Sequence, residues 1–305
     1  MSDWAIGIDI GGTKIAAGLV NLATGQVERP VRVPTQVERG GDLVLAACVD
    51  LATDLDGDGA LAVGIAIPEL VGRQGEVQSA YQFDWTDLDL QWAFAQRPVT
   101  VASDVRAAAR AEATFGAGTG SSSMLYVSIG TGISSTFVLD GVPWAGARGN
   151  ALVLSSGYLS MIDDDTGSLV GSVLEEWAAG PALVTRYRGA GGEAGRTTRE
   201  VLELAASGDP VASPLVRNAA VALGSAIGQA VNILDPELVV VGGGLGLAGG
   251  IWWGTIVNSA RTSIWSEQTR EIPITTARLG AEAGLVGAAM ETRSVRLGSG
   301  TGPST

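Results

Sequence analysis

The sequence predicts an α/β protein with two similar lobes, each a mixed sheet flanked by helices. Apolar runs with the length of buried strands alternate along the 305-residue chain with alanine-rich segments of helical spacing. An apolar hairpin with glycine in its turn also occurs twice, as AIGIDI-GGTK-IAAGLV from residue 5 and as MLYVSI-GTG-ISSTFVL from residue 124. With 46% apolar residues, the chain can fill two cores of ordinary size.

Each expected element rests on its own apolar pattern. The two hairpins account for strands at 5–10, 15–20, 124–129 and 133–139, and other apolar runs predict strands at 61–68, 99–103, 238–244 and 272–277. Helices are expected at 43–55, 106–115, 174–187 and 211–234. Gly224 and Gly228 lie inside the last of these helices and predict close packing there, at some loss of helix propensity.

The predicted lobes are residues 1–115 and 116–280, with a helix at 281–295 that returns to the first lobe. Residues 296–305, small and polar at their end, are expected to form a disordered tail. Trp252 and Trp253 are expected in the core, with an exposed patch for dimerisation as the alternative.

Composition excludes several classes of function. The chain has no histidine, which excludes Ser–His–Asp hydrolysis and histidine-ligated zinc and leaves a carboxylate as the expected general base. A net charge of −13 without a basic run makes nucleic acid and anionic membranes poor partners. One cysteine, Cys48, allows no internal disulfide, and no signal or membrane segment is evident, so we expect a cytoplasmic protein.

Glycine clusters and carboxylates follow four of the predicted strands. They are Asp9 with Gly11, Gly12, Thr13 and Lys14; Ser103 with Asp104; Gly130, Thr131 and Gly132; and Gly242, Gly243 and Gly244. Ligands of open α/β sheets bind where strands end, and glycine lets backbone N–H groups approach phosphate oxygens. The two hairpins therefore indicate a nucleoside triphosphate site, with Asp9 as an outer partner of Mg²⁺. The alternative for each cluster is a simple turn.

Two familiar nucleotide-binding motifs were compared with the sequence. The pattern GxxxxGK[ST] is absent, which excludes a Walker-type phosphate loop. Residues 244–249 match G-x-G-x-x-G after a strand and leave a dehydrogenase as an alternative, although a glycine-rich chain produces such matches easily.

Four motifs together resemble the ROK family of bacterial sugar kinases and sugar-responsive repressors. They are DIGGTK at 9–14, SDVRAAARAE at 103–112, IGTGIS at 129–134 and DPELVVVGGGL at 235–245. The resemblance covers nearly the whole chain and implies the two-lobed actin/hexokinase-like (ribonuclease H-like) fold. Because the phosphate motif begins at residue 9, where a repressor would carry a DNA-binding domain, we expect the kinase branch.

The resemblance also implies roles for individual residues, with ATP and Mg²⁺ as cofactors. Asp104 would be the general base that accepts the proton of the sugar hydroxyl, while helix N-capping is the alternative for this residue. Asp9 would hold Mg²⁺ through water. Phosphate contacts would come from Gly11, Gly12, Thr13, Lys14, Gly130, Thr131 and Gly132, and adenosine contacts from Gly242, Gly243 and Gly244.

The acceptor pocket departs from the family pattern. Ser103 stands where the family has asparagine, and Val153 and Ser156 stand where it has glutamate and histidine. Glu175 remains as an expected sugar ligand beside Ser103 and Asp104. Val173 occupies the place of the last zinc-binding cysteine, so no structural zinc is expected and the loop at 155–171 must be held by other contacts.

Glu69 follows Pro68 where the family has glycine. A carboxylate there could pair with an ammonium group and select an amino sugar; the alternative is that Glu69 points to solvent. The sequence thus predicts an ATP-dependent kinase for the primary (6-)hydroxyl of an unusual amino sugar such as kanosamine, of the kind made in antibiotic pathways. A C7-cyclitol kinase, a glucokinase-like enzyme and a non-catalytic sugar- or nucleotide-binding protein are the alternatives. A homodimer is expected, with a small-molecule sugar or cyclitol as substrate.

Overall fold

The computed structural model describes residues 3–162 and 166–298 and divides into two compact units. The first unit consists of the described residues within 1–120, 141–151 and 278–305, and the second of those within 121–140 and 152–277. Residues 116–120, 141–151 and 278–280, which the sequence places in the second lobe, belong to the first unit. None of the helices in the described ranges combines the length and apolar character needed to cross a membrane.

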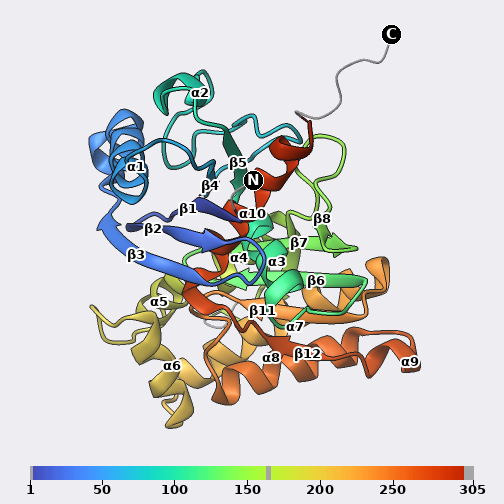
Figure 1. The fold of residues 1–305 in the computed structure, drawn as a ribbon. Helices are drawn as coiled ribbons and strands as arrows, with labels where there is room; N and C mark the ends of the chain where they lie inside the picture. The colour runs from blue at the N-terminus through green and yellow to red at the C-terminus, as the bar shows by residue number, and fades with distance from the viewer. Residues whose placement is uncertain (1–2, 163–165, 299–305) are drawn as a thin grey trace. The chain divides into compact units, whose positions relative to one another are not determined.

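The first unit is built on a five-stranded mixed sheet of order β3-β2-β1-β4-β5 (Figure 1). The strands are β1 Trp4–Ile10, β2 Lys14–Asn21, β3 Val27–Pro34, β4 Val63–Ile67 and β5 Val99–Ser103. Strands β1, β4 and β5 run parallel, whereas β2 and β3 are antiparallel to their neighbours. The carboxyl ends of the three parallel strands therefore share one edge, and this edge carries the predicted site residues of the unit.

Successive residues of β1 point to opposite faces of the sheet, and helices of this unit cover both faces. The helices are α1 Gly41–Leu55, α2 Leu90–Ala93, α3 Asp104–Phe115 and α10 Ala283–Gly298, with short 3₁₀ turns at Val37–Arg39 and Gly280–Glu282. Ile6, Ile8 and Ile10 pack in one core with Val44 and Cys48 of α1. Gly7 lies on the opposite face, where an added Cβ would collide with the carbonyl of Leu285 in α10.

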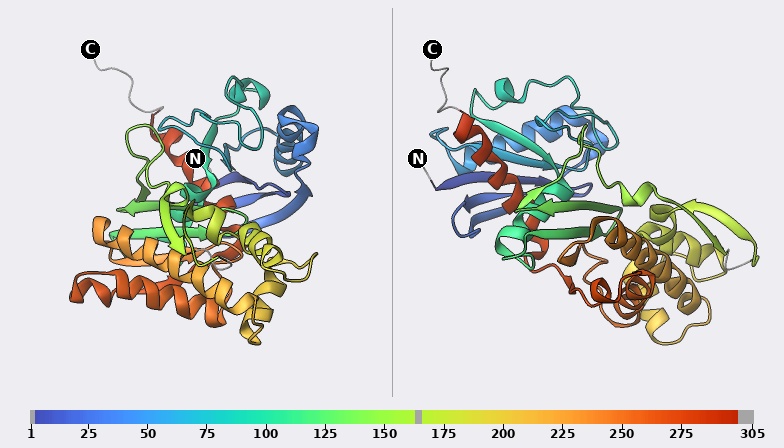
Figure 2. Two further views of the ribbon diagram at one scale, coloured as in Figure 1. Left: turned by 180° about the vertical axis from the view of Figure 1, so that it is seen from behind. Right: turned by 90° about the vertical axis from the view of Figure 1, so that its right-hand side faces the viewer.

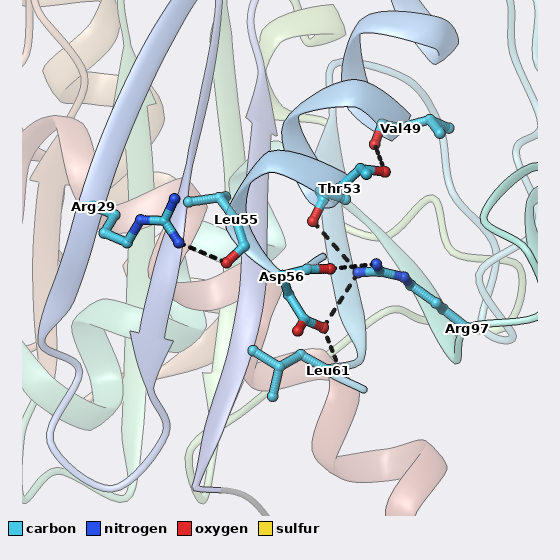
Figure 3. Close-up of polar contacts among 8 residues, drawn as sticks. Arg29, Val49, Thr53, Leu55, Asp56, Leu61 and Arg97 are labelled. Atoms are coloured by element: carbon cyan, nitrogen blue, oxygen red, sulfur yellow. Dashed lines mark hydrogen bonds and ion pairs between the residues drawn. The ribbon is translucent and has the colours of Figure 1, made fainter. Parts of the chain in front are cut away.

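Two arginines satisfy backbone carbonyls at the end of α1 (Figure 3). Arg29 of β3 donates to Leu55 O at 2.8 Å and to Asp54 O at 2.9 Å. Arg97, which is 9% exposed, donates to Asp56 O at 2.6 Å and pairs with the Asp56 carboxylate at 3.5 Å. The carbonyls at a helix end lack intrahelical partners, so these guanidinium groups fix α1 to β3 and to the start of β5.

The sheet of the second unit repeats the pairing pattern of the first, in the order β12-β11-β6-β7. Its strands are β6 Ser123–Ile129, β7 Ile133–Leu139, β11 Leu238–Gly242 and β12 Ile274–Thr276, whereas the short strand β8 Val142–Pro143 belongs to the residues of the first unit. As in the first unit, a glycine-turned antiparallel hairpin (β6–β7) is followed by strands that add in parallel (β11, β12). The recurrence of the hairpin in the sequence thus corresponds to a repeated sheet topology.

Helices pack closely against one another in the second unit (Figure 1). They are α4 Leu174–Ala178, α5 Gly180–Gly189, α6 Thr198–Ala206, α7 Ala212–Leu234, α8 Gly250–Ser263 and α9 Glu267–Arg270. Gly224 and Gly228 of α7 lie against the backbone of α8, where a Cβ on Gly228 would stand 2.5 Å from Ala260 O. Trp252 is 1% exposed and donates to Leu245 O, so the core placement expected for this residue is observed.

An antiparallel hairpin occupies the segment where the family carries its zinc loop. Strands β9 Tyr158–Ile162 and β10 Leu169–Val173 pair over five residues, and Figure 2 shows them as a yellow-green arm. The Tyr158 ring covers Gly171 of the opposite strand, because an added Cβ at Gly171 would collide with the phenol. A 3₁₀ turn at Leu154–Ser156 precedes the hairpin. The pairing of β9 with β10 is therefore the contact that holds the segment after residue 156.

The structure differs from the expected elements in three ways. The helix predicted at 174–187 is two helices, because the chain adopts an extended conformation at Ala179 between α4 and α5. Strands β3, β8, β9 and β10 and helices α2, α6, α8 and α9 were not predicted; β3, for example, is largely exposed and lacks apolar alternation. Helix α10 continues to Gly298, so residues 296–298 of the expected disordered tail are helical, and residues 299–305 lie outside the described part.

Candidate functional site

Asp9 stands at the carboxyl edge of the first sheet, on the face that packs against α10. It pairs in register with Ala66 of β4, one residue before the end of β1. Its carboxylate lies against the first turn of α10, where a Cβ at Gly284 would stand 2.5 Å from Asp9 Oδ2. Among the described residues, none donates a hydrogen bond to this carboxylate. Because residue 284 is glycine, there is room beside it for the Asp9 carboxylate, which has no hydrogen-bond donor among the described residues.

Asp104 is the first residue of α3, immediately after β5 ends. Its Oδ1 accepts the backbone N–H of Val105 at 2.6 Å. The N-cap position belongs to Ser103, whose side chain makes no capping hydrogen bond. The alternative of Asp104 as the helix cap is therefore wrong, and the remaining carboxylate oxygen is not engaged in capping.

Electrostatics couple these two carboxyl groups. Burial and the nearby Asp104 charge raise the pKa of Asp9 to about 7, while Lys14 opposes the shift. Burial also raises the pKa of Asp104 to about 6, with a smaller upward contribution from Glu69 and an opposing one from the Val105 N–H. Desolvation and repulsion between like charges both disfavour ionisation, so this edge of the sheet favours a counter-cation.

The glycine turn between β1 and β2 presents exposed backbone. Gly12, Thr13 and Lys14 are exposed, and the Gly11 N–H closes the turn onto Lys14 O at 2.9 Å. Thr35, which is 4% exposed, donates its hydroxyl to Gly11 O at 2.6 Å and its N–H to Thr13 O. Thr35 was not predicted as part of the site, because a lone threonine after an irregular strand carries no recognisable signal.

Glu69 does not have either of the two orientations considered from the sequence. It is 4% exposed, so it does not point to solvent. Its Oε2 accepts the Ser79 hydroxyl at 2.5 Å and the Tyr81 N–H at 2.8 Å, and its Oε1 accepts the N–H groups of Gln82 and Phe83. These four bonds use the acceptor capacity of the carboxylate, which corrects the expectation that Glu69 pairs with an ammonium group.

Two charged residues of α3 fix this helix to its neighbours, Arg106 beside Asp104 and Glu112 near the other end. Arg106 is 9% exposed and donates to Ser103 Oγ at 3.2 Å and to Val71 O. Glu112 is fully buried and accepts three backbone N–H groups, from Ala117, Arg278 and Leu279. Both lie in the motif at 103–112 but were assigned no role, since a sequence does not show which charged residues are buried.

In the second unit, the turn after β6 is supported by α4 and α5. Glu175 Oε2 accepts the Ile133 N–H at 2.7 Å and lies 2.7 Å from the position of a Cβ on Gly132. The Gly180 N–H donates to Gly130 O at 2.9 Å, while Thr131 is exposed. Glu175, expected as a sugar ligand, thus uses one carboxylate oxygen to hold the glycine turn.

Gly242, Gly243 and Gly244 follow β11, beside the turn that follows β6. Strands β6 and β11 are parallel neighbours, and the N–H groups of Leu245 and Gly246 donate to Ile129 O at 2.9 and 3.0 Å. Gly243 has a φ of +79°, and a Cβ there would collide with Ile129 O. The structure thus brings residues 130–132 and 242–244 together within this unit.

The G-x-G-x-x-G match at 244–249 has a packing explanation. A Cβ on Gly246 would collide with the carbonyl of Gly242, so a glycine is needed for the turn itself. Helix α8 begins only at Gly250, after the last residue of the match. Within the described residues, no group of three or more Asp, Glu, Cys or His side chains is arranged to bind a metal ion.

Comparison with known proteins identifies the family. The ROK family model matches residues 5–294. The chain belongs to the ROK family. A glucokinase of Streptomyces coelicolor is 31% identical over 93% of this chain and 96% of its own length. A kanosamine kinase of Amycolatopsis mediterranei is 30% identical over 78% of this chain and 80% of its own length.

Solved structures show the same fold. A ROK hexokinase from Thermus thermophilus has a TM-score of 0.80 at 33% identity and covers 96% of this chain and 99% of its own. A ROK glucokinase from Streptomyces griseus, in complex with glucose and AMPPNP, has a TM-score of 0.79 at 28% identity, covering 95% and 99% of the two chains. The predicted family, the actin/hexokinase-like fold and the enzyme class, an ATP:sugar phosphotransferase, are confirmed. The dehydrogenase alternative is overturned.

Proposed function

We propose that this ROK sugar kinase transfers the γ-phosphate of ATP to the primary (6-)hydroxyl of its acceptor, with Asp104 as the general base. One observation carries the proposal: Asp9 near the end of β1 and Asp104 directly after β5 stand at the same carboxyl edge of one sheet, next to an exposed glycine turn. A base with a pKa near 6 is largely ionised at neutral pH and able to accept the hydroxyl proton. Little proton transfer is needed early in a loose phosphoryl-transfer transition state.

The residues present fit ATP and Mg²⁺. Asp9 is a half-buried carboxylate without a described hydrogen-bond donor, so it suits a water ligand of Mg²⁺, which would neutralise phosphate charge during transfer. Exposed backbone at Gly12 and Thr13, with Lys14, would hold phosphate oxygens. In the second unit, the turn at 130–132 would do the same and the turn at 242–244 would lie against adenosine.

For the acceptor, we propose an amino sugar such as kanosamine. The kanosamine kinase among the relatives supports this choice, as does the concentration of negative charge from Asp9, Glu69 and Asp104. Attraction of an ammonium group by this field does not require direct contact with Glu69. The Ser103 hydroxyl accepts from Arg106 and keeps its proton for an acceptor oxygen. Glucose and a C7 cyclitol are the competing acceptors.

The test is ADP release from ATP and Mg²⁺ with glucose, mannose, glucosamine, N-acetylmannosamine, kanosamine and a C7 cyclitol, with ³¹P NMR to locate the phosphate. Asp104→Asn should lower kcat by roughly 10²- to 10⁴-fold while nucleotide binding persists. Turnover of glucose alone would reject the amino-sugar proposal. ATP binding without turnover of any acceptor would instead favour a non-catalytic binding protein, an alternative motivated by Val153 and Ser156.

The remaining expectations stay predictions of the same proposal. A homodimer would be tested by sedimentation equilibrium of the purified protein. A cytoplasmic location and a place in antibiotic biosynthesis would be tested by cell fractionation and by the metabolites lost on gene deletion.

A further inference from the structure

Glu69 is buried two residues after β4 ends at Ile67. It faces an irregular segment further along the chain, residues 79–83. Its two oxygens collect one hydroxyl and three backbone N–H groups from this segment. Ser79 is itself fixed, because its hydroxyl oxygen accepts the Leu70 N–H at 2.8 Å. A carboxylate that gathers so many donors at one point replaces the ladder bonds that a strand or helix would supply.

The same segment is held on its far side by aromatic packing. Phe83 and Trp85 are 4% and 2% exposed, and their ring centroids lie 4.8 Å apart. Between the buried Glu69 anchor and this aromatic pair, Tyr81 and Gln82 are exposed, Tyr81 by 75%. Their backbones are fixed while their side chains remain accessible, which is the arrangement of a pre-organised recognition loop.

The position of this loop connects it with the proposed site. Gln82 Oε1 lies 3.6 Å from where a Cβ on Gly12 would stand, so the amide reaches the turn between β1 and β2. Burial is the main cause of the raised pKa of Asp104, and the nearby Glu69 charge adds a smaller upward contribution. The loop therefore adjoins both the phosphate-binding turn and the proposed base of the same unit.

We propose that Gln82, assisted by Tyr81, is an acceptor-recognising residue, and that Glu69 is the positioning residue that fixes it. This proposal rests on the proposed sugar-kinase function. The Gln82 amide offers both a donor and an acceptor to vicinal hydroxyls, and the exposed Tyr81 ring offers an apolar face to a sugar ring. Glu69 contributes geometry rather than direct contact with the acceptor.

The test compares Gln82→Ala, Tyr81→Ala and Glu69→Gln with two controls from the same stretch. Gln78→Ala removes an exposed amide that bonds only Glu76 through its side chain, and Asp84→Asn alters an exposed carboxylate that bonds Thr86. Steady-state kinetics would use glucose and kanosamine as acceptors. We expect Gln82→Ala to raise the acceptor KM about 10-fold or more, with the KM for ATP unchanged within about twofold. The controls should behave like the wild type.

The positioning role is tested separately by a double-mutant cycle. Glu69→Gln presents an amide NH₂ to N–H donors and should raise the acceptor KM as well, and adding Gln82→Ala should then have little further effect. Ser79→Ala, which keeps the carboxylate, provides a milder variant if Glu69→Gln fails to fold. An unchanged acceptor KM in folded Gln82→Ala and Tyr81→Ala, with an active wild type, would overturn this inference alone. A wild type inactive on every acceptor would overturn the proposed function and the inference together.

Discussion

The burial of Asp104 determines the pH dependence that we expect for the reaction. Desolvation raises its pKa to about 6, and the facing Asp9 and Glu69 are the acidic groups that surround it, with Lys14 and Arg106 as the nearby cations. As a base, it must be ionised, so kcat/KM for the acceptor should fall as pH decreases through about 6. A pH–rate profile from pH 4.5 to 8.5 checks this, and an acidic limb near pH 4 would contradict the assignment.

Asp9 should lower the stability of the ligand-free protein at neutral pH. Its folded-state pKa of about 7 exceeds the ordinary value of 3.8, so folding favours the protonated form. The penalty for ionisation is small below pH 4 and grows until pH passes 7. Asp9→Asn removes it and should raise the unfolding free energy more at pH 8 than at pH 5, by on the order of 2 kcal/mol.

Urea unfolding at the two pH values measures this difference. Asp84→Asn is the matched control: hydrogen bonds from Thr86 lower the pKa of that exposed carboxyl group, so it is ionised in the folded and the unfolded protein at both pH values, and its replacement should give no pH-dependent difference. A gain from Asp9→Asn that does not depend on pH would show that shape rather than charge is responsible. Loss of activity in Asp9→Asn would show that the carboxylate that destabilises the ligand-free protein is needed for the reaction.

Residue types alone could predict only part of this site. Asp9, Asp104 and the glycine turns follow from strand ends and glycine clusters, which are local features of the sequence. The role of Glu69 could not be predicted, because its four donors come from residues 79–83, which lack any periodic pattern. Glu175 likewise holds a turn more than 40 residues away in the chain, at Ile133 (175 − 133 = 42).

At the scale of elements, α7 and α8 test the packing role of glycine. A glycine inside a helix normally lowers stability by about 1 kcal/mol relative to alanine. Gly228→Ala should nevertheless be destabilising by about 2 kcal/mol or more, because its Cβ would stand 2.5 Å from Ala260 O. Gly254→Ala in α8 is the control: its Cβ would have open space and should stabilise slightly. Equal effects of the two substitutions in thermal unfolding would contradict close packing.

Element prediction succeeded where apolar periodicity was strong and failed where tertiary contacts decide. The strand at 99–103 and the helix at 211–234 were placed within one residue of β5 and α7. The β9–β10 hairpin was not foreseen, because the family pattern suggested only that zinc ligands were missing at Val173 and its neighbours. Strand β3 is recruited by pairing with β2 rather than by its own sequence.

For the whole molecule, charge makes nucleotide binding depend on Mg²⁺. The chain carries a net charge of −13, and Asp9, Glu69 and Asp104 add their carboxyl groups at one sheet edge, so an uncomplexed triphosphate would be repelled. AMPPNP with Mg²⁺ at about 100 times Kd should stabilise the folded protein by about 2.7 kcal/mol, which corresponds to a Tm increase on the order of 5 °C. The same analogue with EDTA should give a much smaller increase.

Differential scanning fluorimetry at constant ionic strength separates this effect from simple screening. Asp9→Asn should reduce the difference between the Mg²⁺ and EDTA samples, because a neutral amide attracts the cation less than the carboxylate does. Gly254→Ala, an exposed position in α8 of the second unit, should keep the full difference. An equal Tm increase with Mg²⁺ and with EDTA would remove Asp9 from its proposed role, since nucleotide binding would then proceed without the cation that this residue is expected to hold.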